Sequence, residues 1–160
     1  MKNIRVGIGY DVHRLEDDHP FFLGGVKIPY HRGALGHSDA DTLIHAIIDA
    51  LLGAAGLGDI GQHFPDSDET LKGIDSKVLL NITMDLIENE DFLIGNVDCT
   101  ICLEKPKIAT YIPAMQTTLS EVMGVDKSQI SIKATTTEGL GLAGREEGLS
   151  VYAVALLYKE

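Results

Sequence analysis

Apolar and polar residues alternate along much of this chain with the two-residue period of a β-strand. The N-terminal run carries apolar side chains at every second position, namely Ile4, Val6, Ile8, Tyr10 and Val12. We expect this strand to have one packed face and one mixed face. The same pattern predicts further strands over 21–28 (a strand pair or hairpin), 95–103, 130–136 and 149–158.

Three other segments have the 3.6-residue period of an amphipathic helix. The first is expected to begin at Ser38, a favourable N-cap residue with Asp41 three positions later, and its apolar stripe covers 43–52. A second helix is expected over 75–88, and a third over 106–123 with an interruption at a proline. The packed stripe of the second helix is expected to consist of Val78, Leu79, Ile82, Leu86 and Ile87.

The segments 29–36, 57–73 and 138–148 have no periodic pattern and are expected to be loops. With 160 residues, of which 44% are hydrophobic, the chain fits one domain (1–160) with one core. Strands that are adjacent at both ends of the chain predict an α+β fold, a mixed β-sheet with helices packed on one face.

Charge and segment composition narrow the function classes. Thirteen Lys and Arg against 24 Asp and Glu give a net charge of −11, which argues against a nucleic-acid partner. A phosphorylated small molecule remains possible, provided that the site has its own positive charge. No apolar run approaches the roughly 20 residues of a membrane-spanning helix. The N-terminal residues lack a signal-peptide pattern, so we expect a cytoplasmic protein.

The two cysteines, Cys99 and Cys102, have the C-x-x-C spacing of some redox and zinc sites. They lie in a predicted strand, where residues three apart point to opposite faces. We therefore expect both cysteines to be structural, in a protein of a reducing compartment.

Asp11 and His13 are two apart on the first strand and therefore share a face. With His45 from the first helix they provide three protein ligands and leave a fourth position open, as in a catalytic zinc site. Asp41, His45 and Asp49 are four apart, so we expect them to share a polar stripe beside the buried one. Asp49 is placed to orient the His45 imidazole. The alternative is that all of these are ordinary hydrogen-bonded polar residues.

Glycines and the remaining histidines provide weaker signals. Gly7 and Gly9 share the strand face of Asp11 and are expected to leave room above the backbone.

The segments 56–61 and 139–144 match G-x-G-x-x-G, but neither lies between a strand and a helix, so we exclude a dinucleotide site. Three histidines in irregular stretches are expected to be solvated: His19, His31 and His63.

A run of hydroxyl side chains precedes an acid at Thr135, Thr136, Thr137 and Glu138. Such a cluster is suited to phosphate oxygens and a hard cation such as Mg²⁺. The alternative is a threonine-rich strand that ends in a solvated acid.

Taken together, six ordered motifs identify a resemblance. They are G-x-x-x-D-V-H from Gly7, H-S-D-A-D-x-x-x-H from His37, D-A-L-L-G-A-A-x-L-G-D-I-G from Asp49, F-P-D-S-D from Phe64, K-A-T-T-T-E from Lys133 and G-R-x-E-G from Gly144. From Arg5 to Leu157 the chain closely resembles the 2-C-methyl-D-erythritol 2,4-cyclodiphosphate synthase family.

The resemblance implies an activity and an assembly. These enzymes are α+β homotrimers with active sites between subunits. They convert 4-diphosphocytidyl-2-C-methyl-D-erythritol 2-phosphate, a CDP-linked substrate, into the cyclic diphosphate and release CMP. The implied zinc ligands, for one Zn²⁺ per subunit, are Asp11, His13 and His45. Glu138 is implied to bind a second ion, Mg²⁺ or Mn²⁺.

The resemblance also implies further site residues. Those with catalytic roles are His37, Ser38, Asp59, Thr136 and Glu138. Those that contact the substrate are Asp11, His13, Gly61, Phe64, Pro65, Asp66, Ser67, Asp68, Leu103, Glu104, Lys105, Pro106, Lys107, Ile108, Ala109, Thr135, Thr137, Leu142 and Arg145. The 64–68 loop is implied to close over the methylerythritol part, and 103–109 of the adjoining subunit to hold the cytidine.

Two positions depart from the pattern of the family. Leu142 stands where an aromatic residue is frequent, and Tyr152 where a carboxylate occurs. The isoprenoid diphosphate that some members hold in a central cavity, with Arg145 as its anchor, is therefore not expected here. Two other functions fit the same residues: a zinc-dependent phosphohydrolase, and a non-catalytic trimeric module in which zinc joins strand to helix.

Overall fold

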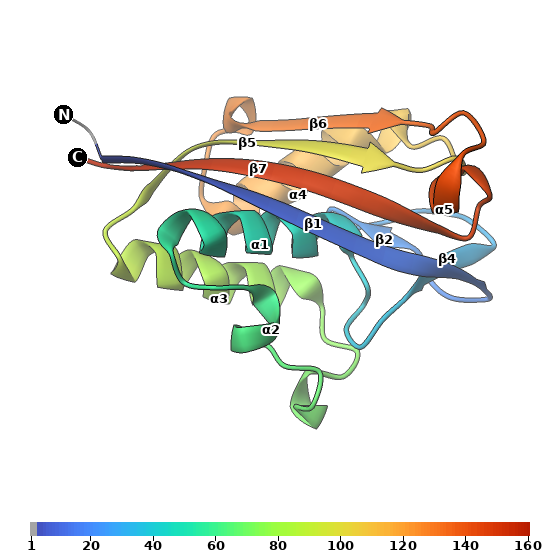
Figure 1. The fold of residues 1–160 in the computed structure, drawn as a ribbon, viewed down its shortest axis with the longest axis horizontal. Coiled ribbons are helices and arrows are strands. Elements are labelled where there is room, and N and C mark those ends of the chain that lie inside the picture. The colour runs from blue at the N-terminus through green and yellow to red at the C-terminus, as the bar shows by residue number, and fades with distance from the viewer. Residues whose placement is uncertain (1–2) are drawn as a thin grey trace.

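In the computed structural model, which describes residues 3–160, five strands form one sheet in the order β4-β1-β7-β5-β6 (Figure 1). These strands are β1 Asn3–Asp17, β4 Arg32–Leu35, β5 Leu93–Cys102, β6 Ile130–Thr135 and β7 Gly148–Lys159. β1 and β5 each pair antiparallel with the central β7, whereas β5 pairs parallel with β6. A separate hairpin joins β2 Phe22–Leu23 and β3 Val26–Lys27.

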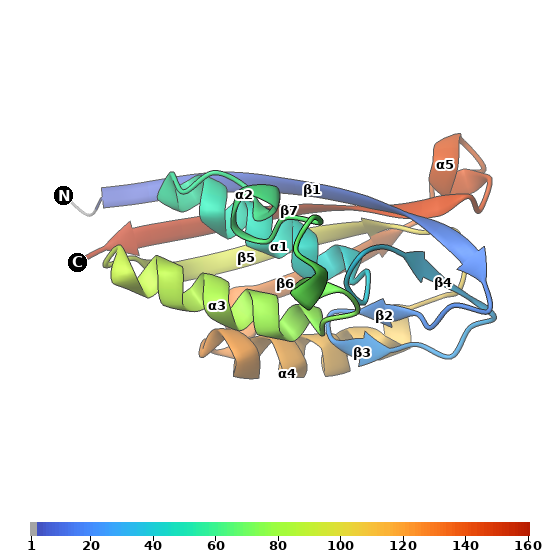
Figure 2. The same cartoon turned by 90° about the horizontal axis from the view of Figure 1, so that it is seen from below.

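The long helices lie on one face of this sheet, which confirms the predicted α+β class (Figure 2). The three long helices are α1 Thr42–Ala55, α3 Ser76–Asn89 and α4 Ile112–Met123. Short helices are α2 Ile60–His63 and α5 Gly141–Gly144, with 3₁₀ turns at Glu69–Leu71, Ala109–Tyr111 and Lys127–Gln129. No helix within residues 3–160 has the length and apolar character needed to cross a membrane.

The start of α1 differs from the prediction. Asp41, not Ser38, is the N-cap, and its carboxylate accepts a hydrogen bond from the Ile44 backbone N–H at 3.0 Å. The same carboxylate accepts the backbone N–H groups of Gly24 and Gly25 and is fully buried. Asp41 therefore joins the hairpin to α1 and does not belong to the polar stripe that we predicted with His45.

α1 lies unusually close to β1 because two glycines face it. A Cβ atom at Gly9 would lie 1.9 Å from the Ala46 carbonyl oxygen, and one at Gly7 would lie 2.1 Å from the Ala50 carbonyl oxygen. The predicted room above these glycines is thus filled by the helix backbone. This contact determines the distance between α1 and the strand that carries Asp11.

The opposite face of β1 is apolar and exposed, which corrects the expectation of a packed face. Ile4, Val6 and Ile8 have exposed fractions of 58%, 64% and 69%. Neighbouring β7 adds exposed Tyr152 and Val154, and the Tyr152 ring lies 4.9 Å from that of Tyr10. The apolar alternation therefore marks a second sheet face that this chain leaves uncovered, not the core.

Several local predictions need correction. The segment 106–108, expected to begin the third helix, is irregular, and α4 begins only beside Pro113, which occupies its first turn. In α3, Leu79 and Ile87 are buried as predicted, whereas Val78 and Ile82 are exposed and Leu80 is buried in addition. The predicted loops contain β4, α2 and α5, elements too short to produce a periodic pattern.

Candidate functional site

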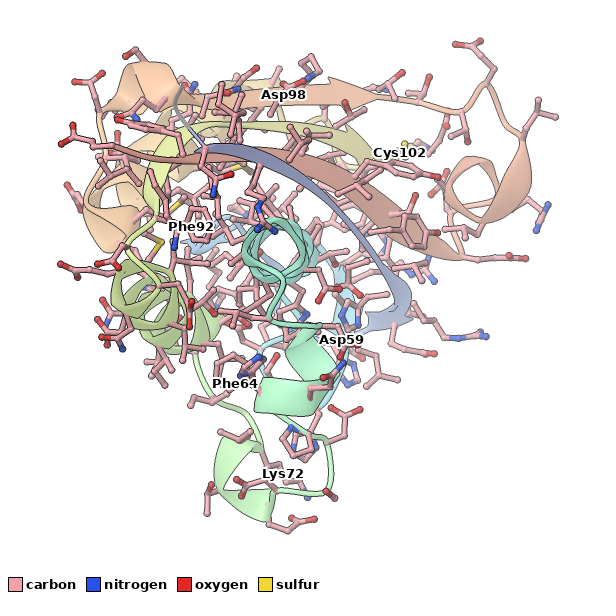
Figure 3. All side chains as sticks on the ribbon, turned by 60° about the vertical axis from the view of Figure 1, so that its left-hand side comes forward. Asp59, Phe64, Lys72, Phe92, Asp98 and Cys102 are labelled. Atoms are coloured by element: carbon pink, nitrogen blue, oxygen red, sulfur yellow. The ribbon has the colours of Figure 1, made fainter. Side chains whose placement is uncertain are left out.

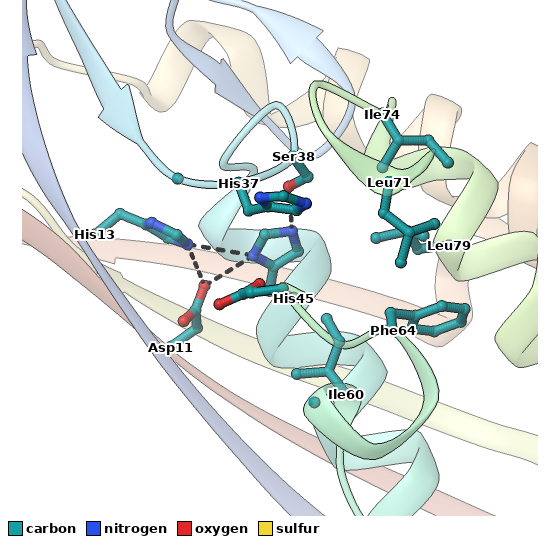
Figure 4. Close-up of a pocket in the computed structure, with 13 residues that line it drawn as sticks. Asp11, His13, His37, Ser38, His45, Ile60, Phe64, Leu71, Ile74 and Leu79 are labelled. Atoms are coloured by element: carbon teal, nitrogen blue, oxygen red, sulfur yellow. Dashed lines mark hydrogen bonds and ion pairs between the residues drawn. The ribbon is translucent and has the colours of Figure 1, made fainter. Parts of the chain in front are cut away.

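A cavity of about 300 Å³ opens where β1, α1 and the segment 60–79 meet (Figure 4). One wall is polar and the other apolar. The lining residues are Asp11, His13, Gly36, His37, Ser38, His45, Ile60, Gly61, Phe64, Asp66, Leu71, Ile74 and Leu79.

Three ligand atoms from two elements converge on the polar wall. His13 Nε2 lies 3.0 Å from Asp11 Oδ2 and 3.2 Å from His45 Nδ1, and the last two atoms are 3.1 Å apart. Figure 4 shows the three side chains pointing toward one another. Within residues 3–160 this is the only group of three side chains that is suited to hold a metal ion.

The hydrogen bonds around His13 direct a lone pair into this group. Its Nδ1 lies 2.8 Å from the Leu35 carbonyl oxygen, which only accepts, so Nδ1 carries the proton. In the neutral ring Nε2 is then unprotonated and faces the Asp11 carboxylate and His45. Electron-rich atoms at such distances repel one another unless a proton or a cation lies between them.

The spacing suits zinc. A tetrahedral Zn²⁺ with bonds of about 2.0–2.1 Å separates its ligand atoms by about 3.3–3.4 Å, close to the observed 3.0–3.2 Å. One carboxylate with two imidazoles is a donor set that leaves a fourth position for a ligand in the cavity. The residues present therefore fit the expected metal.

The pKa shifts of Asp11 and His13 agree with the geometry of this three-residue group. Burial raises the pKa of Asp11, but hydrogen bonds and charge interactions with protonated His13 and His45 outweigh it and lower the pKa to about 2. Burial lowers the pKa of His13, whereas the hydrogen bond with Asp11 raises it, and the net shift is upward. An ionised Asp11 thus attracts positive charge to this point.

Asp49 does not orient His45, contrary to the prediction. Its Oδ1 accepts the backbone N–H of Ile60 at 2.7 Å and so anchors the start of α2. The second nitrogen of His45, Nε2, instead lies 2.9 Å from Ser76 Oγ and 3.1 Å from Ser38 Oγ. Burial raises the pKa of Asp49.

The other residues expected at this cavity divide into two groups. His37, Ser38, Gly61, Phe64 and Asp66 line it. Pro65, Ser67, Asp68 and Asp59 do not line it. Asp59 is the N-cap of α2, and Asp68 caps the following 3₁₀ turn through Thr70.

A second cavity, of about 150 Å³, lies beside the C-terminal ends of β5 and β6. It is lined by Leu103, Pro106, Lys107, Ile108, Ala109, Ala134, Thr135 and Thr136. The predicted residues Glu104, Lys105 and Thr137 do not line it. Lys105 is engaged by Glu146 at 3.0 Å, and Lys107 Nζ donates only a 3.3 Å hydrogen bond to the Glu104 carbonyl oxygen.

Glu138 is exposed and lines neither cavity, although Thr136 Oγ1 lies 3.3 Å from its Oε1. Its φ of 54° is unusual for a residue with a side chain. Arg145 forms a paired contact with Glu147, at 3.1 and 3.2 Å. Leu142 lines a further cavity, of about 160 Å³, which is also lined by His13.

Residues 4–158 match the model of the YgbB family. The chain belongs to the YgbB family. Among curated YgbB relatives, the 2-C-methyl-D-erythritol 2,4-cyclodiphosphate synthase of Porphyromonas gingivalis is 58% identical over 98% of this chain and 96% of the relative. The synthase of Clostridium botulinum is 54% identical over 96% of this chain and 99% of the relative.

Solved structures agree with the family. The Plasmodium falciparum IspF in complex with CDP is 36% identical, with a TM-score of 0.86 over 98% of this chain and 97% of that one. The bifunctional IspDF of Campylobacter jejuni reaches a TM-score of 0.96 at 39% identity. This YgbB chain matches all of its own length but only 43% of that bifunctional chain.

In this YgbB chain, the cavity at the metal-ligand cluster and the second cavity share no lining residue. Figure 3 shows Cys102, which precedes the second cavity, on the sheet, whereas Asp59 and Phe64 project from the region of α2. The metal-ligand cluster and the second cavity are therefore two separate sites within one chain.

The cysteines and the remaining histidines contribute little to either site. Cys99 is buried and Cys102 half-buried on opposite faces of β5, as predicted, and burial raises the pKa of the Cys99 thiol to about 12. His19 and His31 are exposed. His63 is not solvated as expected, because it is half-buried and its Nε2 lies 2.8 Å from the Leu57 carbonyl oxygen.

Sequence reasoning missed part of the first cavity. In its apolar wall, Ile60 and Leu71 come from the segment 57–73, which we expected to be a loop, whereas Leu79 belongs to the packed stripe predicted for the second helix. The contact between Ser76 and His45 was also not predicted. A single serine at a helix start carries no signal of a contact 31 residues away in the chain.

Proposed function

We propose that this protein converts 4-diphosphocytidyl-2-C-methyl-D-erythritol 2-phosphate into 2-C-methyl-D-erythritol 2,4-cyclodiphosphate with release of CMP. The observation that carries the proposal is the convergence of Asp11, His13 and His45 at a cavity that is also lined by His37 and Ser38. The curated YgbB relatives at 54–58% identity carry the name of this synthase.

In this reaction the 2-phosphate attacks the β-phosphorus of the same molecule, and the bond to the CMP oxygen breaks. Both reacting groups are anionic, so their repulsion and the charge on the departing CMP are the main obstacles. A zinc ion held by Asp11, His13 and His45 would supply positive charge and polarise a phosphate oxygen. That charge is needed because the chain itself has a net charge of −11.

The cavity residues would bind and orient the reacting end of the substrate. The Ser38 hydroxyl and the His37 imidazole face the cavity and would hydrogen-bond a phosphate. Phe64, Leu71 and Leu79 would pack against the methylerythritol carbons and exclude water, which favours cyclisation over hydrolysis. Holding the two phosphates together supplies a proximity effect without a covalent intermediate.

The second cavity would hold the cytidine. Its apolar floor of Leu103 and Ile108 suits a pyrimidine ring, and Lys107, Thr135 and Thr136 are placed for polar contacts at its edge. Glu138, which follows this threonine run, would bind the Mg²⁺ or Mn²⁺ that neutralises the charge on the α- and β-phosphate oxygens.

A homotrimer would bring the two cavities together across subunit boundaries. The exposed apolar face of β1 and β7, with Ile4, Val6, Ile8 and Tyr152, supports such an assembly, because surfaces of this kind are usually covered by a partner. The separation of the two cavities within one chain supports a shared active site.

The deciding experiment incubates the purified protein with the diphosphocytidyl substrate, zinc and magnesium, and identifies both products. We expect CMP and the cyclic diphosphate, one zinc per chain, and loss of turnover in His45→Ala. The matched control is His31→Ala, which removes an exposed imidazole outside both cavities and is expected to leave turnover and zinc content unchanged.

Two outcomes would contradict the proposal. A linear diphosphate product would indicate a phosphohydrolase that activates water at the same metal. A protein that unfolds on zinc removal and releases no CMP when zinc is restored would be a module in which the metal only joins β1 to α1.

A further inference from the structure

The second nitrogen of His45 faces a buried serine. Nε2 lies 2.9 Å from the hydroxyl oxygen of Ser76, the first residue of α3, whose exposed fraction is 0%. Ser38 Oγ lies 3.1 Å from the same nitrogen, but it borders the cavity and already accepts the Ala40 backbone N–H (Figure 4). Ser76 is therefore the nearer and the more enclosed of the two partners.

The direction of the hydrogen bond between Ser76 and His45 follows from Asp39. The Asp39 carboxylate accepts the backbone N–H groups of Asp41 and Ser76, each at 3.1 Å, and the Ser76 hydroxyl. A carboxylate only accepts, so the Ser76 hydroxyl proton points to Asp39. The Ser76 oxygen is then an acceptor toward His45, and the hydrogen bond between them requires a proton on Nε2.

The hydrogen bond with Ser76 competes with a second interaction of the His45 ring, which favours the other tautomer. Asp11 Oδ2 lies 3.1 Å from His45 Nδ1 and favours a proton on that nitrogen, which would block it as a metal ligand. A proton held on Nε2 keeps the Nδ1 lone pair available in the neutral ring. His13 needs the opposite tautomer, which its hydrogen bond to the Leu35 carbonyl oxygen provides.

We propose that Asp39 and Ser76 are a positioning pair that holds the His45 ring, with its proton on Nε2, so that Nδ1 faces Asp11 and His13. The pair acts through His45 and touches neither metal nor substrate. It also ties the ring to two further elements, because Asp39 lies in the segment before α1 and Ser76 begins α3. The backbone supports this link, since Asp39 N donates to the Ile74 carbonyl oxygen at 3.0 Å.

The test compares Ser76→Ala with Thr83→Val. Thr83 is a second fully buried hydroxyl in α3, which donates to the Leu79 carbonyl oxygen within the helix. Each zinc-loaded protein is titrated with a competing chelator. We expect Ser76→Ala to bind zinc about 10- to 100-fold more weakly than the wild type, as is usual when an outer partner of a ligand is lost. Thr83→Val is expected to keep wild-type affinity.

A second readout locates the proton of the His45 ring directly. In metal-free wild-type protein with ¹⁵N-labelled histidine, above the pH at which the imidazole signals stop shifting, we expect the His45 proton on Nε2. In Ser76→Ala it is expected to move toward Nδ1, a change that mere loss of packing would not cause. Wild-type zinc affinity in Ser76→Ala, or a wild-type His45 proton on Nδ1, would overturn the proposal.

This inference rests on the proposed zinc site, and the two fail separately. Absence of zinc affinity in the wild type would reject the metal site itself. A wild type that binds zinc tightly, with Ser76→Ala equally tight, would reject only the positioning pair.

Discussion

Substitution of Gly9 by alanine tests whether the close contact between β1 and α1 sets the geometry of the metal ligands. The new Cβ would lie 1.9 Å from the Ala46 carbonyl oxygen, whereas a relaxed carbon–oxygen contact needs about 3.2 Å. The helix must therefore move away from the strand by about 1.3 Å or tilt. His45 precedes Ala46 on the helix, and Asp11 follows Gly9 by two residues on the strand, so this shift separates the ligand atoms.

A metal site tolerates deviations of only about 0.2 Å in its bond lengths, so we expect Gly9→Ala to lose zinc affinity by about 100-fold or more. It should also lower the free energy of unfolding by about 1–3 kcal/mol, as overpacking does. Chelator competition and urea unfolding measure the two effects.

Gly53→Ala is the matched control for Gly9→Ala. It lies in α1 itself, and its Cβ would approach nothing closer than the Ile8 carbonyl oxygen at 4.0 Å. This variant should keep zinc affinity and gain up to about 1 kcal/mol from helix propensity. Wild-type zinc affinity in a folded Gly9→Ala protein would refute the argument that this contact positions the site.

Three further predictions follow from the structure. Asp41→Ala leaves three backbone N–H groups without their acceptor and should cost about 3 kcal/mol or more in urea unfolding; a loss below about 1 kcal/mol would contradict this. Ile8→Glu places a charge on the exposed apolar face and should yield monomers in sedimentation that keep zinc but lose turnover; an intact trimer would reject that face as the interface. The hydrogen bond from Lys133 lowers the pKa of Asp98, so its contribution is present above about pH 4 and is lost as the pH falls through the lower folded value. The difference in urea midpoint between Asp98→Asn and the wild type should therefore shrink below about pH 4, and a constant difference would contradict the assignment.

The elements with a strong period could be predicted from the sequence, and so could the convergence of Asp11, His13 and His45. Asp11 and His13 share a strand face by their spacing alone, and the helix that carries His45 has a clear apolar stripe. Asp41 shows where such reasoning ends. Its role as N-cap and as acceptor for Gly24 and Gly25 depends on a hairpin 16 and 17 residues away in the chain, which local pattern does not reveal.

The first strand shows a different limit. Its alternation identified a β-strand, but the face with the large apolar residues is exposed, and the face with Gly7 and Gly9 packs against α1. A helix can approach a sheet this closely only over residues without a Cβ, so the face with Gly7 and Gly9 is the one that α1 covers. A period reveals two faces but does not say which of them the chain covers itself.

The pairing of β1 with β7 also determines how the polypeptide can be joined to others. Asn3 is opposite Lys159, so the first and last described strands begin and end side by side, while His13 pairs with Leu149 near the other end of the ribbon (Figure 1). A bridge of a few residues is long enough to close the backbone into a ring there. Reopening that ring at the exposed turn around Gly124 should give a circular permutant with both cavities intact. A protein fused at either original end would lie at the end of the β1–β7 ribbon that is opposite His13.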